Sequence, residues 1–371
     1  MSAPRWLTSR TADLVAAAAL ALALPGLWIA PRIFFASWLV AWWFWIGLAL
    51  GALANTWIHA LTGGRWGLAL QLLARPIARR LPWLLLLALP IAAGLRTLYP
   101  WAGTTAWTRD IELPAFQLAW YSPPFFAARM AAIALVWWAI AQPGIFARKG
   151  RVAAALLAYV VTGTLAALDL VGSLVPGWIS TGNGLVELAG GALGGAALAS
   201  FAAASFAADR FPTPAPRPAT RRAPPVWRDL GNLLLMWTMT WAYLAFVEFL
   251  IIWAEDLPRE VAWFVPRLAG GWAGVGLALA GLQFAAPLAA LLWRANKDDP
   301  RRLARIALGL VAGQLLNTAW LVLPSVEPDS ALGWWLVPLF ALAFGLPVVG
   351  RGVRELEAAA RDAPIREAVH A

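Results

Sequence analysis

The chain contains repeated apolar stretches, each about as long as a helix that crosses a lipid bilayer. A bilayer core of about 30 Å needs about 20 apolar residues in helical form. Hydrophobic residues make up 61% of the 371 and charged residues only 13%, unlike a soluble domain. These features predict an all-α integral membrane protein. The ten predicted spans are 14–29, 33–61, 83–98, 125–140, 152–174, 184–206, 230–253, 268–293, 303–323 and 332–349.

Basic residues are concentrated on one side of this predicted topology. With ten spans, both termini lie on one side, and that side holds 23 of the 29 Lys and Arg residues. Such an excess marks the cytoplasmic side, so both termini are predicted to be cytoplasmic. The net charge of +10 is therefore explained by topology rather than by nucleic-acid binding.

The predicted organisation has two membrane regions. Residues 1–210 contain spans one to six, and residues 229–350 contain spans seven to ten. Between them, 211–228 form a Pro- and Arg-rich segment, predicted to be an extended cytoplasmic linker. Residues 351–371 form a cytoplasmic tail. Gly and Ala clusters at 190–199 indicate close helix packing in span six.

The chain has no cysteine and two histidines, His59 inside a span and His370 near the C-terminus. These counts exclude iron–sulfur clusters, c-type haem attachment and thiolate metal sites in this chain. A buried haem usually needs two axial ligands, and only one histidine lies in a span. Redox chemistry therefore requires a diffusible cofactor such as a quinone, or partner subunits.

Three acidic residues lie inside predicted spans: Asp169 in span five, Glu187 in span six and Glu248 in span seven. A carboxylate at bilayer depth costs a few kcal/mol, so it normally faces a partner or a water-filled cavity. At about 1.5 Å per residue, Asp169 lies about 10 Å and Glu248 about 8 Å from the outer ends of their spans. Three acids in the outer half predict a path for protons or a substrate.

Each acid also has a structural interpretation. Glu187 comes three residues into its span, where it can be interfacial and solvated, and the other two acids can bond a neighbouring helix. Thr162 and Ser173 share a helix face with Asp169 because they are seven and four residues away from it. These two residues join the candidate path.

Further polar residues occur toward the cytoplasmic side and in other spans. His59 is a candidate proton relay because its reference pKa is near neutral, although a hydrogen bond to a backbone carbonyl explains it equally well. Thr240 is a further candidate in span seven. Other polar side chains of the spans can form interhelical hydrogen bonds or a hydrated track: Asn55, Thr56, Thr62, Gln283, Gln314, Asn317 and Thr318.

Two segments resemble a known family. Residues 168–184 read LDLVGSLVPGWISTGNG, and residues 241–253 read WAYLAFVEFLIIW, followed at 256–263 by DLPREVAW. Both resemble the ActF-type membrane subunit of alternative complex III, a quinol:cytochrome c oxidoreductase. That subunit is related to NrfD-like, polysulfide-reductase-type membrane proteins. The segment HALTGGRW at 59–66 fits more loosely. Leu170 replaces a usual Trp, Gly182 and Asn183 replace bulkier residues, and Glu248 replaces a neutral polar residue.

The resemblance implies a multi-pass subunit of the bacterial inner membrane, with ten spans built around two four-helix bundles. It also implies a possible quinone site, for menaquinone or ubiquinone, and a candidate proton path with Asp169 as its shared acid. Haems and iron–sulfur clusters would belong to partners: a multihaem cytochrome, an iron–sulfur subunit and a sister ten-span subunit. Two alternatives remain open, a proton-coupled secondary transporter and a purely structural scaffold.

Overall fold

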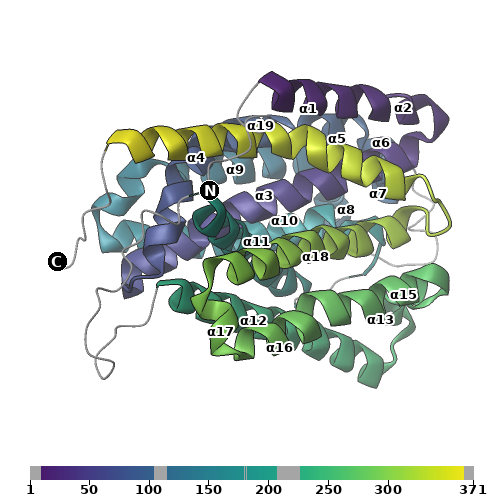
Figure 1. Cartoon of the computed structure of the whole chain (residues 1–371). Helices are drawn as coiled ribbons and strands as arrows, with labels where there is room; N and C mark the ends of the chain where they lie inside the picture. Colours follow the sequence, from purple (N-terminus) through teal and green to yellow (C-terminus); the bar gives the residue numbers. More distant parts are fainter. Residues whose placement is uncertain (1–9, 104–114, 179, 181, 207–225, 363–371) are drawn as a thin grey trace.

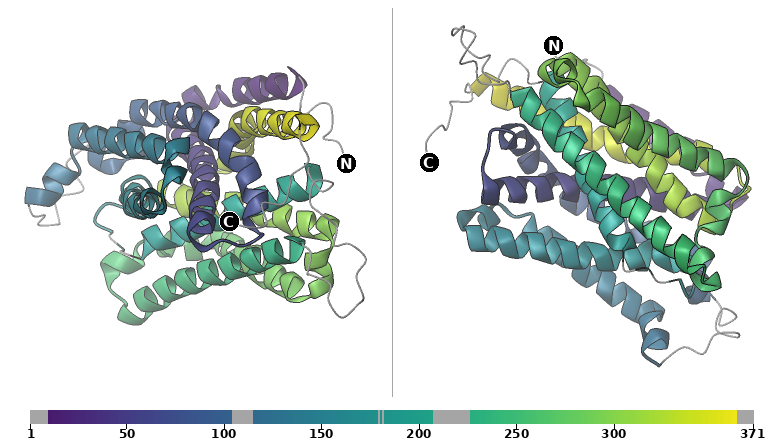
Figure 2. Two further views of the ribbon diagram at one scale, coloured as in Figure 1. Left: turned by 90° about the vertical axis from the view of Figure 1, so that its left-hand side faces the viewer. Right: turned by 90° about the horizontal axis from the view of Figure 1, so that it is seen from below.

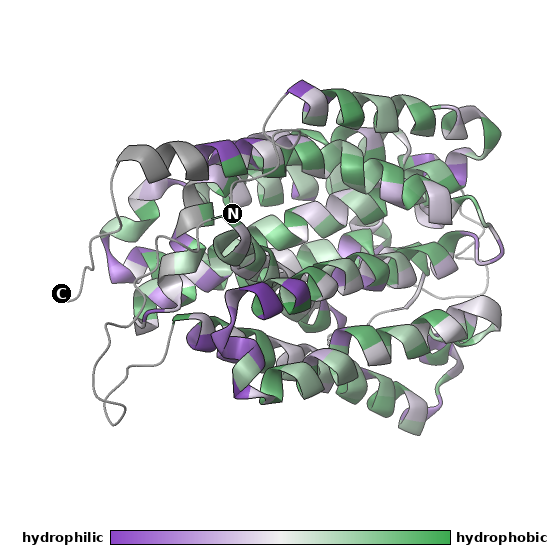
Figure 3. Ribbon diagram, viewed as in Figure 1, coloured by the Kyte–Doolittle hydropathy of each residue, from purple (hydrophilic) through white to green (hydrophobic). Residues whose placement is uncertain are grey.

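The computed structural model describes residues 10–103, 115–178, 180, 182–206 and 226–362. Within these ranges the secondary structure is entirely helical, and ten helical stretches are long and apolar enough to cross a membrane (Figure 1). Figure 3 shows hydrophobic residues along the helices and hydrophilic residues concentrated toward their ends. The predicted all-α, multi-pass membrane architecture is confirmed. The stretches are Arg10–Ile29, Pro31–Thr62, Pro76–Ala93, Pro123–Ile140, Lys149–Leu174, Asn183–Phe206, Val226–Glu255, Gly270–Leu292, Pro300–Val326 and Gly333–Glu355.

The first half of the chain forms six of these stretches. Its principal helices are α1 (Arg10–Ala23), α2 (Gly26–Ile29), α3 (Pro31–Thr62), α4 (Gly67–Leu86), α5 (Leu89–Ala93), α6 (Leu95–Leu98), α9 (Pro123–Ile140), α10 (Lys149–Leu170) and α11 (Asn183–Phe206). Short helices connect them: α7 (Pro100–Gly103), α8 (Ala115–Trp120), η2 (Pro143–Ala147) and η3 (Gly172–Leu174).

The second half supplies the other four stretches. It consists of α12 (Val226–Glu255), α13 (Pro258–Val261), α14 (Val265–Leu268), α15 (Gly270–Leu279), the π-helical turn η6 (Ala280–Ala285), α16 (Ala286–Leu292), α17 (Arg294–Asp298), α18 (Pro300–Val326) and α19 (Gly333–Asp362). Most of the predicted linker at 211–228 lies outside the described residues, as does His370. The last helix continues well past the predicted span end at residue 349.

The third span begins earlier than predicted, at Pro76 instead of residue 83, and its helix breaks after Leu86. Two tryptophans of α3 repair the break, because Trp42 Nε1 donates to the Leu84 carbonyl at 2.7 Å and Trp38 Nε1 to the Leu87 carbonyl at 2.8 Å. Backbone groups freed inside a membrane need such partners. The interruption before Pro90 is thereby stabilised by side chains from a neighbouring span.

Helices α3 and α11 form the centre of the bundle, and most of their residues are buried. They approach closely because glycines face each other, Gly47 and Gly51 on α3 against Gly191 and Gly195 on α11. A Cβ atom added to Gly51 would overlap the carbonyl of Gly191. This contact confirms the close packing predicted for residues 190–199.

The two membrane regions pack together. Helix α11 contacts both α12 and α18, and α19 packs against α1 and α3. In the view from below, α12 and the α15–α16 stretch lie side by side on the outer surface of the bundle (Figure 2). Helices α10 and α12 end, and α11 begins, at one end of the bundle, which we call the acid-bearing end because Asp169, Glu187 and Glu248 lie toward it.

Candidate functional site

Asp169 is held in a buried ion pair. It lies in the last turn of α10, where a negative charge is unfavourable to the helix dipole. Arg129 of α9 donates to both carboxylate oxygens, Nε to Oδ2 and Nη2 to Oδ1, each at 2.9 Å. The indole of Trp120 also donates to Oδ1 at 2.9 Å, and the guanidinium lies 4.0 Å from the centre of that ring. Asp169 is thus neutralised by a cation and joins α9 to α10.

The two polar residues predicted to accompany Asp169 have local bonding partners. The Ser173 hydroxyl donates to the Asp169 backbone carbonyl at 2.6 Å and accepts from Trp101 Nε1 at 3.1 Å. Thr162 donates to the Ala158 carbonyl at 2.6 Å and accepts from Trp137 Nε1 at 3.0 Å. These bonds explain both hydroxyls as parts of helix packing near Asp169.

Glu248 lies where the two segments that carry the family resemblance meet. Ser180 Oγ donates to Glu248 Oε1 at 2.5 Å. The rings of Trp178 and Trp263 stack with their centres 4.2 Å apart, and Trp178 Nε1 donates to the Glu260 carbonyl at 3.1 Å. Two segments 68 to 85 residues apart in the chain, 178–180 and 248–263, are therefore in contact here.

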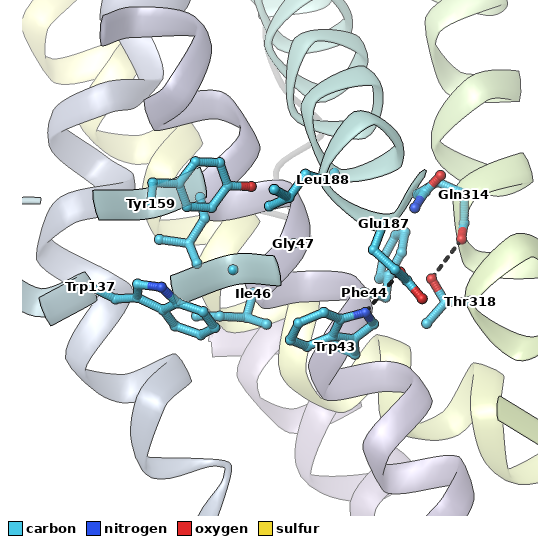
Figure 4. A pocket seen from close by; sticks show the side chains of 13 residues that line it. Trp43, Phe44, Ile46, Gly47, Trp137, Tyr159, Glu187, Leu188, Gln314 and Thr318 are labelled. Carbon is cyan, nitrogen blue, oxygen red and sulfur yellow. Dashed lines mark hydrogen bonds between the residues drawn. The ribbon is translucent and has the colours of Figure 1, made fainter. Parts of the chain in front are cut away.

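Glu187 is buried on α11, one turn beyond Asn183, and only 6% of it is exposed. Trp43 Nε1 of α3 donates to its Oε2 at 3.0 Å (Figure 4). Its other oxygen, Oε1, has no hydrogen-bond partner among the described residues, and the Asn183 amide one turn away interacts with Glu248. Buried polar atoms of this kind are normally satisfied by ordered water or an ion.

A small cavity adjoins Glu187. It is lined mainly by α3, α10 and α11, with Trp137 of α9 and two polar residues of α18, Gln314 and Thr318 (Figure 4). The space open to the centres of water-sized molecules is about 20 Å³. A water molecule needs about 10–15 Å³ on this measure, and small-molecule pockets usually reach about 300–1,000 Å³. The cavity therefore has room for a water molecule and not for a quinone ring.

Arg267, in the short helix α14, is a further buried charge at this end. It is fully buried, with its guanidinium 3.4 Å from the centre of the Trp263 ring. It donates to the carbonyls of Trp263 and Leu321 and, at 2.7 Å, to Ser325 Oγ. Glu187 and Glu248 both interact with it electrostatically, and they also interact with each other. No direct ion pair joins Arg267 to either acid among the described residues.

The sequence analysis assigned no role to Arg267, which lies at the edge of the predicted span 268–293. Its position near Pro266 at the edge of a predicted span gave no signal of burial. The Trp263 stack, four residues earlier, is the only local feature that could have indicated it. Only the fold brings Arg267 near the acids.

Polar groups continue from Glu187 toward the bundle interior. Gln314 Oε1 accepts from Gln283 Nε2 at 2.9 Å, and the Thr318 hydroxyl donates to the Gln314 backbone carbonyl at 2.9 Å. Gln283 lies in η6, the π-helical turn that interrupts the eighth span, and its Oε1 has no partner among the described residues. Such turns occur often at functional sites. The polar side chains predicted in spans eight and nine thus meet near Glu187.

His59 lies apart from this group, at the end of α3. Its Nε2 is 2.8 Å from the Gly64 carbonyl, and its ring packs edge-on against Trp66. This contact matches the structural alternative for His59, a hydrogen bond to the backbone. Thr240 is also satisfied locally, because its hydroxyl donates to the Met236 carbonyl at 2.9 Å.

The site therefore consists of two parts. In the first, Asp169 is fully ion-paired. In the second, Glu187 and Glu248 have no ion-pair partner within the described residues and both interact electrostatically with the buried Arg267, and Glu187 also lines the water-sized cavity. No group of three or more His, Asp or Glu residues suited to a metal occurs in the described ranges. No protein-family model matches the chain, and none of the curated proteins compared with it matches either.

Proposed function

We propose that this chain is a membrane subunit of a quinol-oxidising respiratory complex of the alternative complex III type, in which Glu187 and Glu248 carry protons. The observation that supports this most is that neither Glu187, which is buried, nor Glu248, which is partly buried, has an ion-pair partner among the described residues. In a medium of low dielectric constant, two carboxylates beside one cation favour the binding of a further positive charge. A proton is the smallest such charge, and the neighbouring cavity can hold the water that would deliver it.

Quinol oxidation releases two electrons and two protons. In the proposed complex the electrons pass to haems and iron–sulfur clusters of partner subunits, since this chain has no cysteine to hold a cluster. The protons pass through Glu187 and Glu248 to the outer side of the bacterial inner membrane. The quinone, menaquinone or ubiquinone, binds outside the small cavity, at the surface of this subunit or in its sister subunit.

The proposed topology puts both termini in the cytoplasm and the acid-bearing end at the outer face. The distribution of Lys and Arg supports this orientation. We further propose that the ten spans correspond to two four-helix bundles with peripheral helices. In this arrangement the unpaired acids lie where protons leave the membrane.

The test uses the assembled complex in its native membrane, with the variants Glu187→Gln and Glu248→Gln. Glu255→Gln, an exposed acid at the end of the same helix as Glu248, is the matched control. Quinol turnover and protons released per quinol are measured together. Loss of a proton-transfer group typically costs about 10²-fold or more, so turnover should fall by about that factor in the two site variants. Unchanged turnover and proton release in both would favour a structural scaffold.

A further inference from the structure

The outward-facing side chains of α12 follow a regular spacing. Seven exposed positions recur four and three residues apart in alternation, with the neighbouring Ile251 also exposed, and we call these seven the α12 seam: Asn232, Met236, Met239, Tyr243, Phe246, Leu250 and Trp253. A mean spacing of 3.5 residues is that of the contact line between two helices that cross at a small angle. Figure 2 shows that α12 lies on the outer surface of the bundle, where another helix can reach it.

Tyr243 lies deep in the bilayer. The α12 helix has 30 residues, and Tyr243 is 17 residues from its start and 12 from its end. At 1.5 Å per residue, these separations are about 26 Å and 18 Å. With α12 centred on a hydrocarbon core about 30 Å thick, the tyrosine lies about 4 Å from the midplane. The hydroxyl is thus too deep to reach water at either surface.

The Tyr243 hydroxyl has no hydrogen-bond partner in the described part of the chain, and 66% of the residue is exposed. Lipid tails offer no donor or acceptor, so a bare hydroxyl at this depth is unfavourable. The nearby Thr240 hydroxyl avoids the problem by bonding to its own helix. A tyrosine ring is too rigid to reach its own backbone in this way, so its partner must come from another molecule.

The composition of the seam also favours a protein neighbour. Methionine and aromatic residues are enriched in protein interfaces, and Met adapts its shape to the surface opposite. Met239 and Phe246 flank Tyr243 with 45% and 59% of their surface exposed. Together they form a ridge that a helix bearing small residues can pack against.

We propose that a transmembrane helix of another subunit packs along the α12 seam and presents a hydrogen-bonding side chain to Tyr243. This inference rests on the proposed function only in taking the chain to be one subunit of an assembly. The crossing angle expected for such a seam is about 20°. The buried residues of α12, among them Leu234 and Trp241, are not part of the seam, so a partner can bind there without displacing the packing of α12 inside the bundle.

The experiment exploits the absence of cysteine in the natural chain. Single cysteines at Tyr243 and Phe246 are labelled with benzophenone maleimide and irradiated in native membranes that contain the whole complex. A cysteine at Leu135 on α9 is the control, because it is as exposed as Tyr243 but lies on another helix. Cross-linked peptides are then identified by mass spectrometry. We expect both seam positions, and not Leu135, to join one apolar span of a different subunit.

A second variant, Tyr243→Phe, keeps the ring and removes only the hydroxyl. One interhelical hydrogen bond in a membrane changes association by about threefold, so retention of the partner in mild detergent should fall by about that factor. Cross-links to lipid alone, to a second copy of this chain, or equally from Leu135 would overturn the inference. Cross-links to a partner span, together with full proton release in the Glu187 and Glu248 variants, would refute the proposed function and leave the interface standing.

Discussion

Substitution of Asp169 by asparagine removes one half of a buried ion pair while keeping the side-chain shape. The residue is 2% exposed, and the Arg129 side chain is 11% exposed. Two charge-assisted hydrogen bonds from the guanidinium are affected, and the charge of Arg129 is left without its counter-ion. The variant therefore measures how strongly the pair fastens α9 to α10.

The size of the effect follows from this geometry. Removing one partner of a buried pair costs about 3–5 kcal/mol, mainly because the other charge stays buried and unpaired. Asparagine can still accept the bond that Trp120 donates to Asp169, so we expect a loss near the lower end, about 3 kcal/mol. Removing both charges in Asp169→Asn with Arg129→Gln should recover part of the loss, with a coupling energy of about 2 kcal/mol.

Unfolding of the purified protein in mixed micelles with increasing SDS, followed by tryptophan fluorescence, gives the free energies for the double-mutant cycle. Turnover of the assembled complex should survive in the double variant, because Asp169 holds helices together and carries no proton in this account. A loss of less than about 1 kcal/mol in Asp169→Asn, or proton release abolished in the stable double variant, would refute the reasoning.

Three further predictions concern packing, pH and the acid site. Gly51→Ala should destabilise by about 1–3 kcal/mol because its Cβ overlaps α11, whereas Gly309→Ala, which points into open space, should be neutral or stabilising in thermal unfolding. The hydrogen bonds from the Arg228 guanidinium lower the pKa of Asp298. Their ion pair therefore stabilises the protein above about pH 4, and this contribution is lost as pH falls below that. Asp298→Asn should thus cost up to about 1 kcal/mol at pH 7 and progressively less as pH falls below about 4, in melting curves across this range. Trp43→Phe removes the only described hydrogen bond to Glu187, so the free energy of unfolding in SDS should fall by about 1–3 kcal/mol. A change near zero would mean that water replaces the indole as the hydrogen-bond donor to Glu187.

The membrane architecture could be predicted from the sequence because length and apolarity alone define a span. The same holds for the glycine contact between α3 and α11, which composition around residue 190 indicated. The boundaries of the third span could not be predicted. Its broken helix is stabilised by Trp38 and Trp42 of α3, whose indoles donate to backbone carbonyls at the break. Sequence patterns do not show which carbonyls a distant indole will reach.

The candidate site was predictable as a set of residues but not as an arrangement. Depth in a span identified Asp169, Glu187 and Glu248 equally well, yet among the described residues only Asp169 has a counter-ion, Arg129, which is 40 residues away in the chain. Glu187 was interpreted as possibly solvated, whereas it is buried against Trp43 of a distant helix. Pairing between helices depends on their rotation and contact, which a single sequence does not specify.

The central claim, that Glu187 and Glu248 carry protons, is tested most directly by infrared difference spectroscopy of the assembled complex during quinol oxidation. We predict a band from a protonated carboxyl group that changes during turnover and shifts in D₂O. The band should persist in Asp169→Asn and disappear in the double variant Glu187→Gln with Glu248→Gln. A band that stays unchanged in that double variant would contradict the account.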